Sequence, residues 1–180
     1  NVGDMANTGV EVELRATPVK AKNFEWNVNL NFTSYKNEIT YLPEERKTYE
    51  IDGKEGWTSG SYFYGEGCSL YTFHMKQFAG VEEGTGKSMW WKNTLADRVD
   101  AEGNKVLDEK GNVIKDIVGR ETTTSYSDAS YYLCGTALPD VYGGFGTSLT
   151  WGGFDFSIDF SYQIGGQVYD GDYASLMASP

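Results

Sequence analysis

The chain has 180 residues with 26 acidic and 15 basic side chains, a net charge of −11, and so lacks the clustered Lys and Arg that neutralise nucleic-acid phosphates. It combines 15% aromatic residues and 22 Gly with a mean hydropathy of −0.48, which excludes a disordered acidic chain because such chains are poor in aromatics. No run of about 18 apolar residues is present, so a membrane-spanning helix is excluded too. A membrane barrel with a polar interior stays compatible with this composition.

An alternating pattern near the start of the chain predicts a first β-hairpin. Apolar residues alternate with Glu and Arg over 10–16, and after a connector at 18–23 every even position from Phe24 to Phe32 is apolar. A period of two gives one apolar and one polar face. No helix places five consecutive even positions on one side, so both stretches are predicted to be strands.

The clearest pattern, at 154–164, predicts a second hairpin. Every even position there is apolar and every odd one is Asp, Ser or Gln. Before it, Phe145, Leu149 and Trp151 alternate with small or polar residues, and Gly152-Gly153 supplies the positive φ that a tight turn needs.

These strands of about 8 to 12 residues are longer than the usual five or six of soluble sheets, and close to the 9 to 11 of a strand that crosses a bilayer. A soluble antiparallel sandwich would show the same alternation. Alternation alone favours the sandwich, because soluble β-domains far outnumber membrane barrels.

Several stretches, in order along the chain, form a recognisable set. They are Asn1 to Leu14 with Phe24 to Asn31 and Asn37-Glu38-Ile39; Phe78 to Gly86; Gly135 to Phe145 with Trp151 to Ser157; and Gly165 to Asp170. The set resembles the late barrel strands of SusC/RagA-like TonB-dependent outer-membrane transporters. The second stretch departs from the family's "AGVDPETG" pattern, because Glu82 and Glu83 stand where Asp-Pro is usual.

The resemblance implies an all-β fold: an antiparallel meander of long amphipathic hairpins, forming a segment of a transmembrane β-barrel with long extracellular loops. Residues 1–180 would be part of one barrel domain, with a first hairpin at 1–36, a mostly extracellular excursion at 37–138 and a last hairpin at 139–170. Within the excursion, 69–78 and 87–92 are expected to form an irregular hairpin. Four strands, or six with that hairpin, cannot close a barrel, since eight is about the minimum.

The same resemblance implies a function for the whole protein. It is the import of glycan fragments or oligopeptides across the outer membrane of a Gram-negative bacterium, with a SusD-like surface lipoprotein as partner and outer-membrane lipid around the strands. The plug domain and the TonB box, through which TonB would act, are not identified here. The sequence also begins without Met or an export signal, so we expect a piece of a longer protein.

No catalytic, cofactor-binding or metal-binding residues are expected. The first alternative is a soluble extracellular β-sandwich that binds carbohydrate, and the second is a secreted glycan-processing enzyme. The stretch 84–88 lacks the first glycine of a phosphate loop, which would fall on Val81. The repeated motifs at 100–106 and 108–114 fail the spacing of a calcium-binding EF-hand and predict two Gly-Asn turns. The single histidine, His74, is expected to be an ordinary polar strand residue.

Two sets of residues in the irregular middle are candidates for function. Its aromatic side chains can stack on a sugar ring or contact a partner, or instead pack the loop against itself. The candidate contacts are Trp57, Tyr62, Tyr64, Tyr131 and Tyr132. The two cysteines, Cys68 and Cys134, each precede an expected descending strand, and a disulfide between them would staple the excursion in an oxidising compartment.

Overall fold

The computed structural model describes residues 3–108 and 111–177, and the regular secondary structure of this part of the chain consists almost entirely of antiparallel strands. The all-β prediction is confirmed. The described residues form two compact units, residues 3–73 with 134–177, and the described residues of 74–133. The elements are β1 (Asp4–Ala21), β2 (Phe24–Tyr41), a 3-10 turn (Glu44–Arg46), β3 (Tyr49–Ile51), β4 (Lys54–Ser59), β5 (Tyr62–Gly65), β6 (Thr72–Lys76), β7 (Phe78–Val81), β8 (Ser88–Asp97), β9 (Lys115–Thr123), β10 (Tyr131–Thr136), β11 (Val141–Trp151), β12 (Phe154–Ile164) and α1 (Gly171–Met177).

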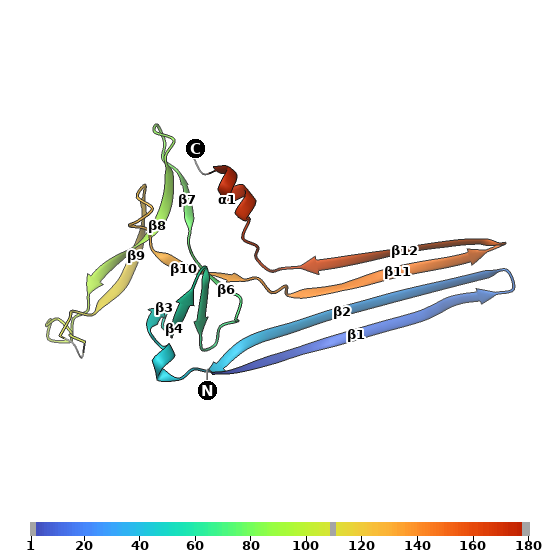
Figure 1. Ribbon diagram of the computed structural model, residues 1–180, viewed down its shortest axis with the longest axis horizontal. Helices are drawn as coiled ribbons and strands as arrows, with labels where there is room; N and C mark the ends of the chain where they lie inside the picture. The colour runs from blue at the N-terminus through green and yellow to red at the C-terminus, as the bar shows by residue number, and fades with distance from the viewer. Residues whose placement is uncertain (1–2, 109–110, 178–180) are drawn as a thin grey trace. The chain divides into compact units, whose positions relative to one another are not determined.

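The four long strands form one sheet in the order β1-β2-β11-β12 (Figure 1). Strand β2 pairs directly with β11, from Thr33↔Tyr142 to Phe24↔Trp151, although residues 42–140 separate them in sequence. The intervening segment therefore leaves and re-enters the sheet at the same end.

The opposite end of the sheet carries two tight turns. Gly152 and Gly153 have φ of +57° and +93°, the left-handed conformation that a two-residue hairpin turn requires. The backbone N–H of Gly152 donates to the carbonyl of Asn23 at 3.1 Å, which ties the two turns together.

The first hairpin is longer than predicted. The connector expected at 18–23 is wrong in extent, because β1 runs to Ala21 and only Lys22 and Asn23 form the turn. The register shifts between Ala16 and Val19. This bulge accommodates Pro18, whose missing N–H is tolerated at bulges and on edge strands.

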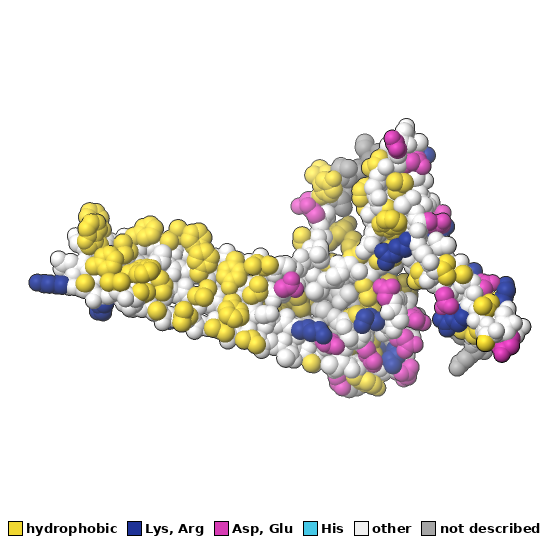
Figure 2. All heavy atoms as spheres, turned by 180° about the vertical axis from the view of Figure 1, so that it is seen from behind, with side chains coloured by type: hydrophobic (Ala, Val, Ile, Leu, Met, Phe, Trp, Pro, Cys, Tyr) yellow, Lys and Arg dark blue, Asp and Glu magenta, His cyan; other side chains and the backbone are white. Residues whose placement is uncertain are grey.

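One face of the four-stranded sheet is apolar and exposed. Figure 2 shows hydrophobic side chains gathered along the long strands. Phe154, Phe156 and Phe160 are 80%, 57% and 48% exposed. A soluble sandwich would bury these rings against a second sheet, so their exposure contradicts that alternative.

The height of the apolar face is similar to that of the outer apolar band of membrane β-barrels. Strand β12 contains 11 residues; at about 3.3 Å per residue and a tilt of about 40° it rises roughly 25 Å, the height of the outer apolar band of membrane barrels. On β2 the apolar residues of this face end at Phe32. The next three positions of the same face are Ser34, Lys36 and Glu38, and Lys36 forms an ion pair with Glu38. The apolar band therefore ends near Ser34, and both β1 and β2 continue beyond it.

A small core in the first unit covers the end of the β1–β2 hairpin. The backbone N–H of Ile39 donates to the carbonyl of Cys68 at 2.8 Å, and that of Gly67 donates back to Ile39 at 2.9 Å. Strands β3, β4 and β5 form consecutive antiparallel pairs, and Phe63 of β5 is fully buried. This core anchors the start of the excursion to the long hairpin.

The second unit contains the sheet β7-β8-β9. The irregular hairpin predicted from 69–78 and 87–92 is corrected: Phe78–Val81 pairs with β8, while Thr72–Lys76 forms the separate strand β6. The turn before β8 closes through the N–H of Glu82, which donates to the carbonyl of Lys87 at 2.8 Å. The glycine-rich stretch at 84–88 is therefore an ordinary hairpin turn.

The repeated Gly-Asn motifs of the second unit form the predicted turns. A carboxylate oxygen of Asp100 accepts the N–H of Asn104 at 2.8 Å, and Asp108 accepts that of Asn112 at 2.8 Å. The N–H of Asn104 is the main cause of a lowered pKa at Asp100. Residues 109 and 110 of the second motif lie outside the described part of the chain.

Three residues spaced eight apart connect these turns. The N–H of Val106 donates to the carbonyl of Arg98, Ile114 donates to Val106, and Arg98 donates to Ile114, at 2.8 to 2.9 Å. The turns are thus held in a closed ring of backbone hydrogen bonds. No helix among the described residues is long and apolar enough to cross a membrane.

Candidate functional site

Three of the predicted contact residues lie in the first unit, and their rings pack on neighbouring side chains. Trp57 and Tyr64 are a cross-strand pair of β4 and β5. Their rings stack with centroids 4.8 Å apart, and the guanidinium of Arg46 lies 5.3 Å from the Trp57 ring centroid. Tyr62 stacks on Phe73 at 5.1 Å. Packing of the excursion against itself accounts for these ring contacts.

The other two predicted residues lie in the second unit. Tyr131 stacks on His74 at 4.5 Å and is 44% exposed. Tyr132 is buried, and its hydroxyl donates to the side-chain oxygen of Asn93 at 2.7 Å. Each of the five aromatics thus contacts a neighbouring side chain, and their role as ligand contacts stays a prediction.

The two cysteines are not joined by a disulfide in the described residues. Cys68 is buried, and burial raises the pKa of its thiol, which keeps the thiol protonated. The predicted bridge to Cys134 is untested and stays a prediction.

His74 should make the second unit sensitive to acid. It is 5% exposed, and burial lowers the pKa of its imidazole below the usual 6.5. The unfolded chain therefore binds a proton more readily than the folded chain, and stability is lost as the pH falls below about 6.5. In hydrogen-exchange mass spectrometry of the full-length protein, corrected for intrinsic exchange rates, we expect β6 to be less protected at pH 5.5 than at pH 7.5.

The control for this prediction is His74→Gln, which keeps a polar side chain but cannot titrate in this range. Its protection at β6 should be equal at the two pH values. If the variant shows the same loss of protection at pH 5.5 as the parent, a group other than His74 is responsible.

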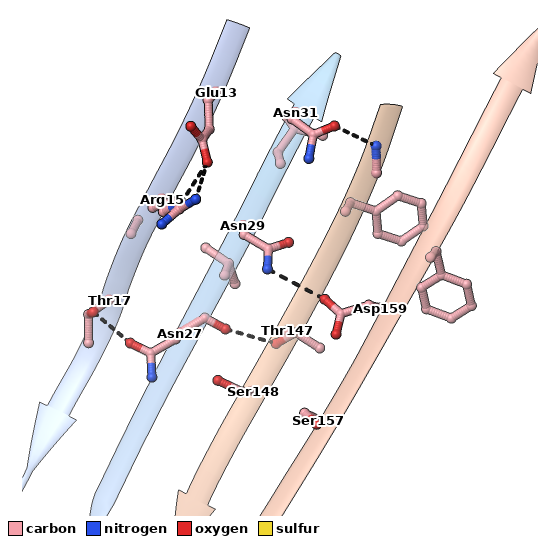
Figure 3. Close-up of a pocket in the computed structure, with 16 residues that line it drawn as sticks. Glu13, Arg15, Thr17, Asn27, Asn29, Asn31, Thr147, Ser148, Ser157 and Asp159 are labelled. Carbon is pink, nitrogen blue, oxygen red and sulfur yellow. Dashed lines mark hydrogen bonds and ion pairs between the residues drawn. The ribbon is translucent and has the colours of Figure 1, made fainter. Parts of the chain in front are cut away.

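The polar face of the four-stranded sheet carries a cavity of about 700 Å³ (Figure 3). Asn27, Asn29 and Asn31 form a row on β2, and Figure 3 shows Asp159 of β12 on the far side of β11. The amide of Asn29 donates to Asp159 at 3.4 Å, and the N–H of Gly144 donates to the side-chain oxygen of Asn31 at 2.9 Å. These carboxamides present both donors and acceptors to anything that enters the cavity.

Glycine on β11 keeps this cavity open. A Cβ on Gly146 would collide with the carboxylate of Asp159 and would lie 2.7 Å from the side-chain oxygen of Asn29. These residues were not predicted from the sequence, although the Asn at every odd position from 27 to 31 was a signal for a polar wall. The sequence does not reveal how β2, β11 and β12 align, and it is this alignment that places Gly146 between Asn29 and Asp159.

In the part of the chain that the structure describes, the acidic residues and the histidine do not assemble into a metal site. No group of three or more His, Cys, Asp or Glu side chains that could hold a metal ion occurs in residues 3–108 and 111–177.

Three proteins that are similar in sequence to this chain are all named TonB-dependent receptors. No family model matches the chain. It is 25% identical to the TonB-dependent receptor P39 of Formosa agariphila, covering 94% of this chain and 18% of that protein. It is 31% identical to receptor P26 of the same organism, covering 94% and 16%. It is 22% identical to the TonB-dependent receptor SusC of Bacteroides thetaiotaomicron, covering 94% and 15%.

Solved structures agree with the curated relatives. The RagAB peptide transporter superposes with a TM-score of 0.64 at 27% identity, covering 92% of this chain and 16% of that chain. The open-open state of the RagAB peptide importer gives 0.64 at 26% identity, covering 92% and 15%. This chain thus spans about a sixth of the length of the proteins it matches. By its relatives and its fold, the chain is similar over most of its length to one part of the SusC/RagA-like TonB-dependent receptors.

Proposed function

We propose that the chain is a segment of the transmembrane barrel of an outer-membrane TonB-dependent transporter, which imports glycan fragments or oligopeptides into a Gram-negative bacterium. The observation that carries this proposal is the four-stranded sheet. Its outer face is exposed and apolar over roughly 25 Å, and its other face is lined with carboxamides, hydroxyls and carboxylates. A wall of this kind separates lipid from a water-filled or plugged interior.

The sheet also supports an orientation and a division of the chain. Membrane barrels of this kind have short periplasmic turns and long extracellular loops. In our proposal the turns at 22–23 and 152–153 face the periplasm, and residues 42–140 form an extracellular excursion within a single barrel domain. A SusD-like lipoprotein would lie on that outer side, and TonB would act on parts of the protein beyond this segment. The similarity to the RagAB peptide transporter supports oligopeptides as one class of cargo.

The full-length protein provides the test. We expect it to fractionate with outer membranes and to change mobility on gels when heated, as membrane barrels do. Cells should accumulate dye-labelled casein peptides or dye-labelled maltooligosaccharides only when the protein and TonB are both present. Recovery of the full-length protein as a secreted soluble species, or uptake that does not depend on TonB, would contradict the proposal.

A further inference from the structure

A second hollow, of about 500 Å³, lies on the polar face of the β1–β2 hairpin, at the end far from the turns. It is lined by Asn7 and Glu11 of β1, by Tyr35 of β2, and by Leu70 and Tyr71 of the segment before β6. Asn7, Gly9 and Tyr35 lie beyond Ser34, where the apolar band of the opposite face ends, whereas Glu11 pairs with Thr33, one position before that limit.

Gly9 also lines the hollow. It lies between Asn7 and Glu11 on β1, directly opposite Tyr35. A Cβ at this position would lie 2.5 Å from both the carbonyl oxygen of Ser34 and the Cβ of Tyr35. The close approach of the two strands therefore requires glycine, which adds no side chain to the hollow.

The walls of the hollow are held in place by direct contacts. The side-chain oxygen of the buried Asn37 accepts the N–H of Leu70 at 2.9 Å, and its amide donates to Asn7 at 2.8 Å. The Tyr35 ring meets Tyr142 edge-on at 6.4 Å. A site fixed before its ligand arrives loses little conformational entropy on binding.

The charge of the hollow is negative and uncompensated. Glu13, on the same face of β1, pairs with Arg15, and Glu25 pairs with Lys20 at 3.0 Å. In contrast, Glu11 makes no ion pair with any residue that the structure describes, and no Lys or Arg lines the hollow. A carboxylate without an ion pair that lines the same hollow as the phenol rings of Tyr35 and Tyr71 suits a cation, through a charge-assisted hydrogen bond and cation–π contacts.

We propose that this hollow binds a positively charged group of a peptide cargo, the ammonium of a lysine side chain, with Glu11 as its counter-ion. This inference rests on the proposed transport function, since it assigns a cargo contact to the same protein. Hydrogen bonds between charged partners are roughly twice as strong as those between neutral groups. A neutral sugar hydroxyl therefore gains less from Glu11 than an ammonium does, and an anionic cargo is repelled.

The test measures binding to the purified full-length protein in detergent, by fluorescence anisotropy. The probes are two dye-labelled alanine pentapeptides, one with a central lysine and one with a central norleucine, which has a similar stem and no charge. We expect the lysine peptide to bind about tenfold more tightly, in line with the strength of charged hydrogen bonds. Glu11→Gln, which preserves the shape of the side chain, should abolish this preference.

Glu13→Gln is the matched control, because Glu13 lies two residues along the same face and is already paired with Arg15. It should leave the preference for lysine intact. Equal binding of the two peptides by the unmodified protein would overturn the proposal, and so would an unchanged preference in Glu11→Gln. Because binding is measured without TonB, these outcomes are independent of the uptake experiment that tests transport.

Discussion

Replacing Phe160 with arginine is expected to prevent stable assembly of the full-length protein in the outer membrane. Phe160 lies near the middle of the apolar face, is 48% exposed, and stacks on Phe145 at 4.9 Å. An arginine on the lipid face of a barrel, close to the bilayer midplane, destabilises it by about 2–4 kcal/mol. The measurement is the amount of heat-modifiable protein recovered from outer membranes, which should fall severalfold or more.

The matched control is arginine at the next position. Ser161 lies on the polar face opposite Gly144, which leaves room for a longer side chain. Ser161→Arg should therefore assemble at close to the level of the unmodified protein. If both substitutions reduce assembly equally, the apolar face of this sheet does not contact lipid.

The second large effect is expected in residues 42–140, the segment between β2 and β11. Phe63 is fully buried and meets the Tyr49 ring at 6.3 Å. Phe63→Ala removes most of a buried aromatic side chain, which typically lowers the free energy of unfolding by about 3–5 kcal/mol. Hydrogen-exchange mass spectrometry of the full-length protein should show faster exchange in β3, β4 and β5, and little change in the four long strands.

Thr58 provides the comparison for this substitution. It pairs with Phe63 across the β4–β5 ladder, but its side chain is exposed. Thr58→Ala should change stability by no more than about 0.5 kcal/mol, as surface substitutions usually do. Equal acceleration of exchange in both variants would mean that Phe63 is not the centre of this core.

The long hairpins could be predicted from the sequence because alternation over many residues is a strong local signal. The strand expected at 154–164 has those bounds in the structure, and Gly152-Gly153 forms its turn. The interpretation of Pro18 as part of a connector was wrong, because a bulge carries β1 past it. A bulge depends on how two strands align, and the alternation within one strand does not contain that information.

The short strands of the excursion were missed although part of their signal was present. Asp52 and Gly53 have φ of +51° and +71° and connect β3 to β4. Asp-Gly is a typical pair for a two-residue hairpin turn, so this turn could have been found. The strands around it have three and six residues, too few for alternation to stand out.

The candidate sites were harder to predict than the strands. The aromatic residues were selected for their place in an irregular segment, and the structure packs each of them on a neighbour. The hollow around Gly9 depends on the alignment of Gly9 with Tyr35 and on the hydrogen bond from Leu70 to Asn37. Both connect residues that are far apart in sequence, which local patterns cannot reveal.

Because β2 pairs directly with β11, the geometry of the four-stranded sheet does not depend on the length of residues 42–140, which lie between these strands in the sequence. Doubling the length of a closed loop adds only about 0.6 kcal/mol of entropic penalty, while strand alignment is fixed by the hairpins on either side. Insertions and deletions in this segment are therefore expected to leave the wall intact. The segment between β2 and β11 is thus free to vary in length and sequence while the pairing of the four long strands stays the same.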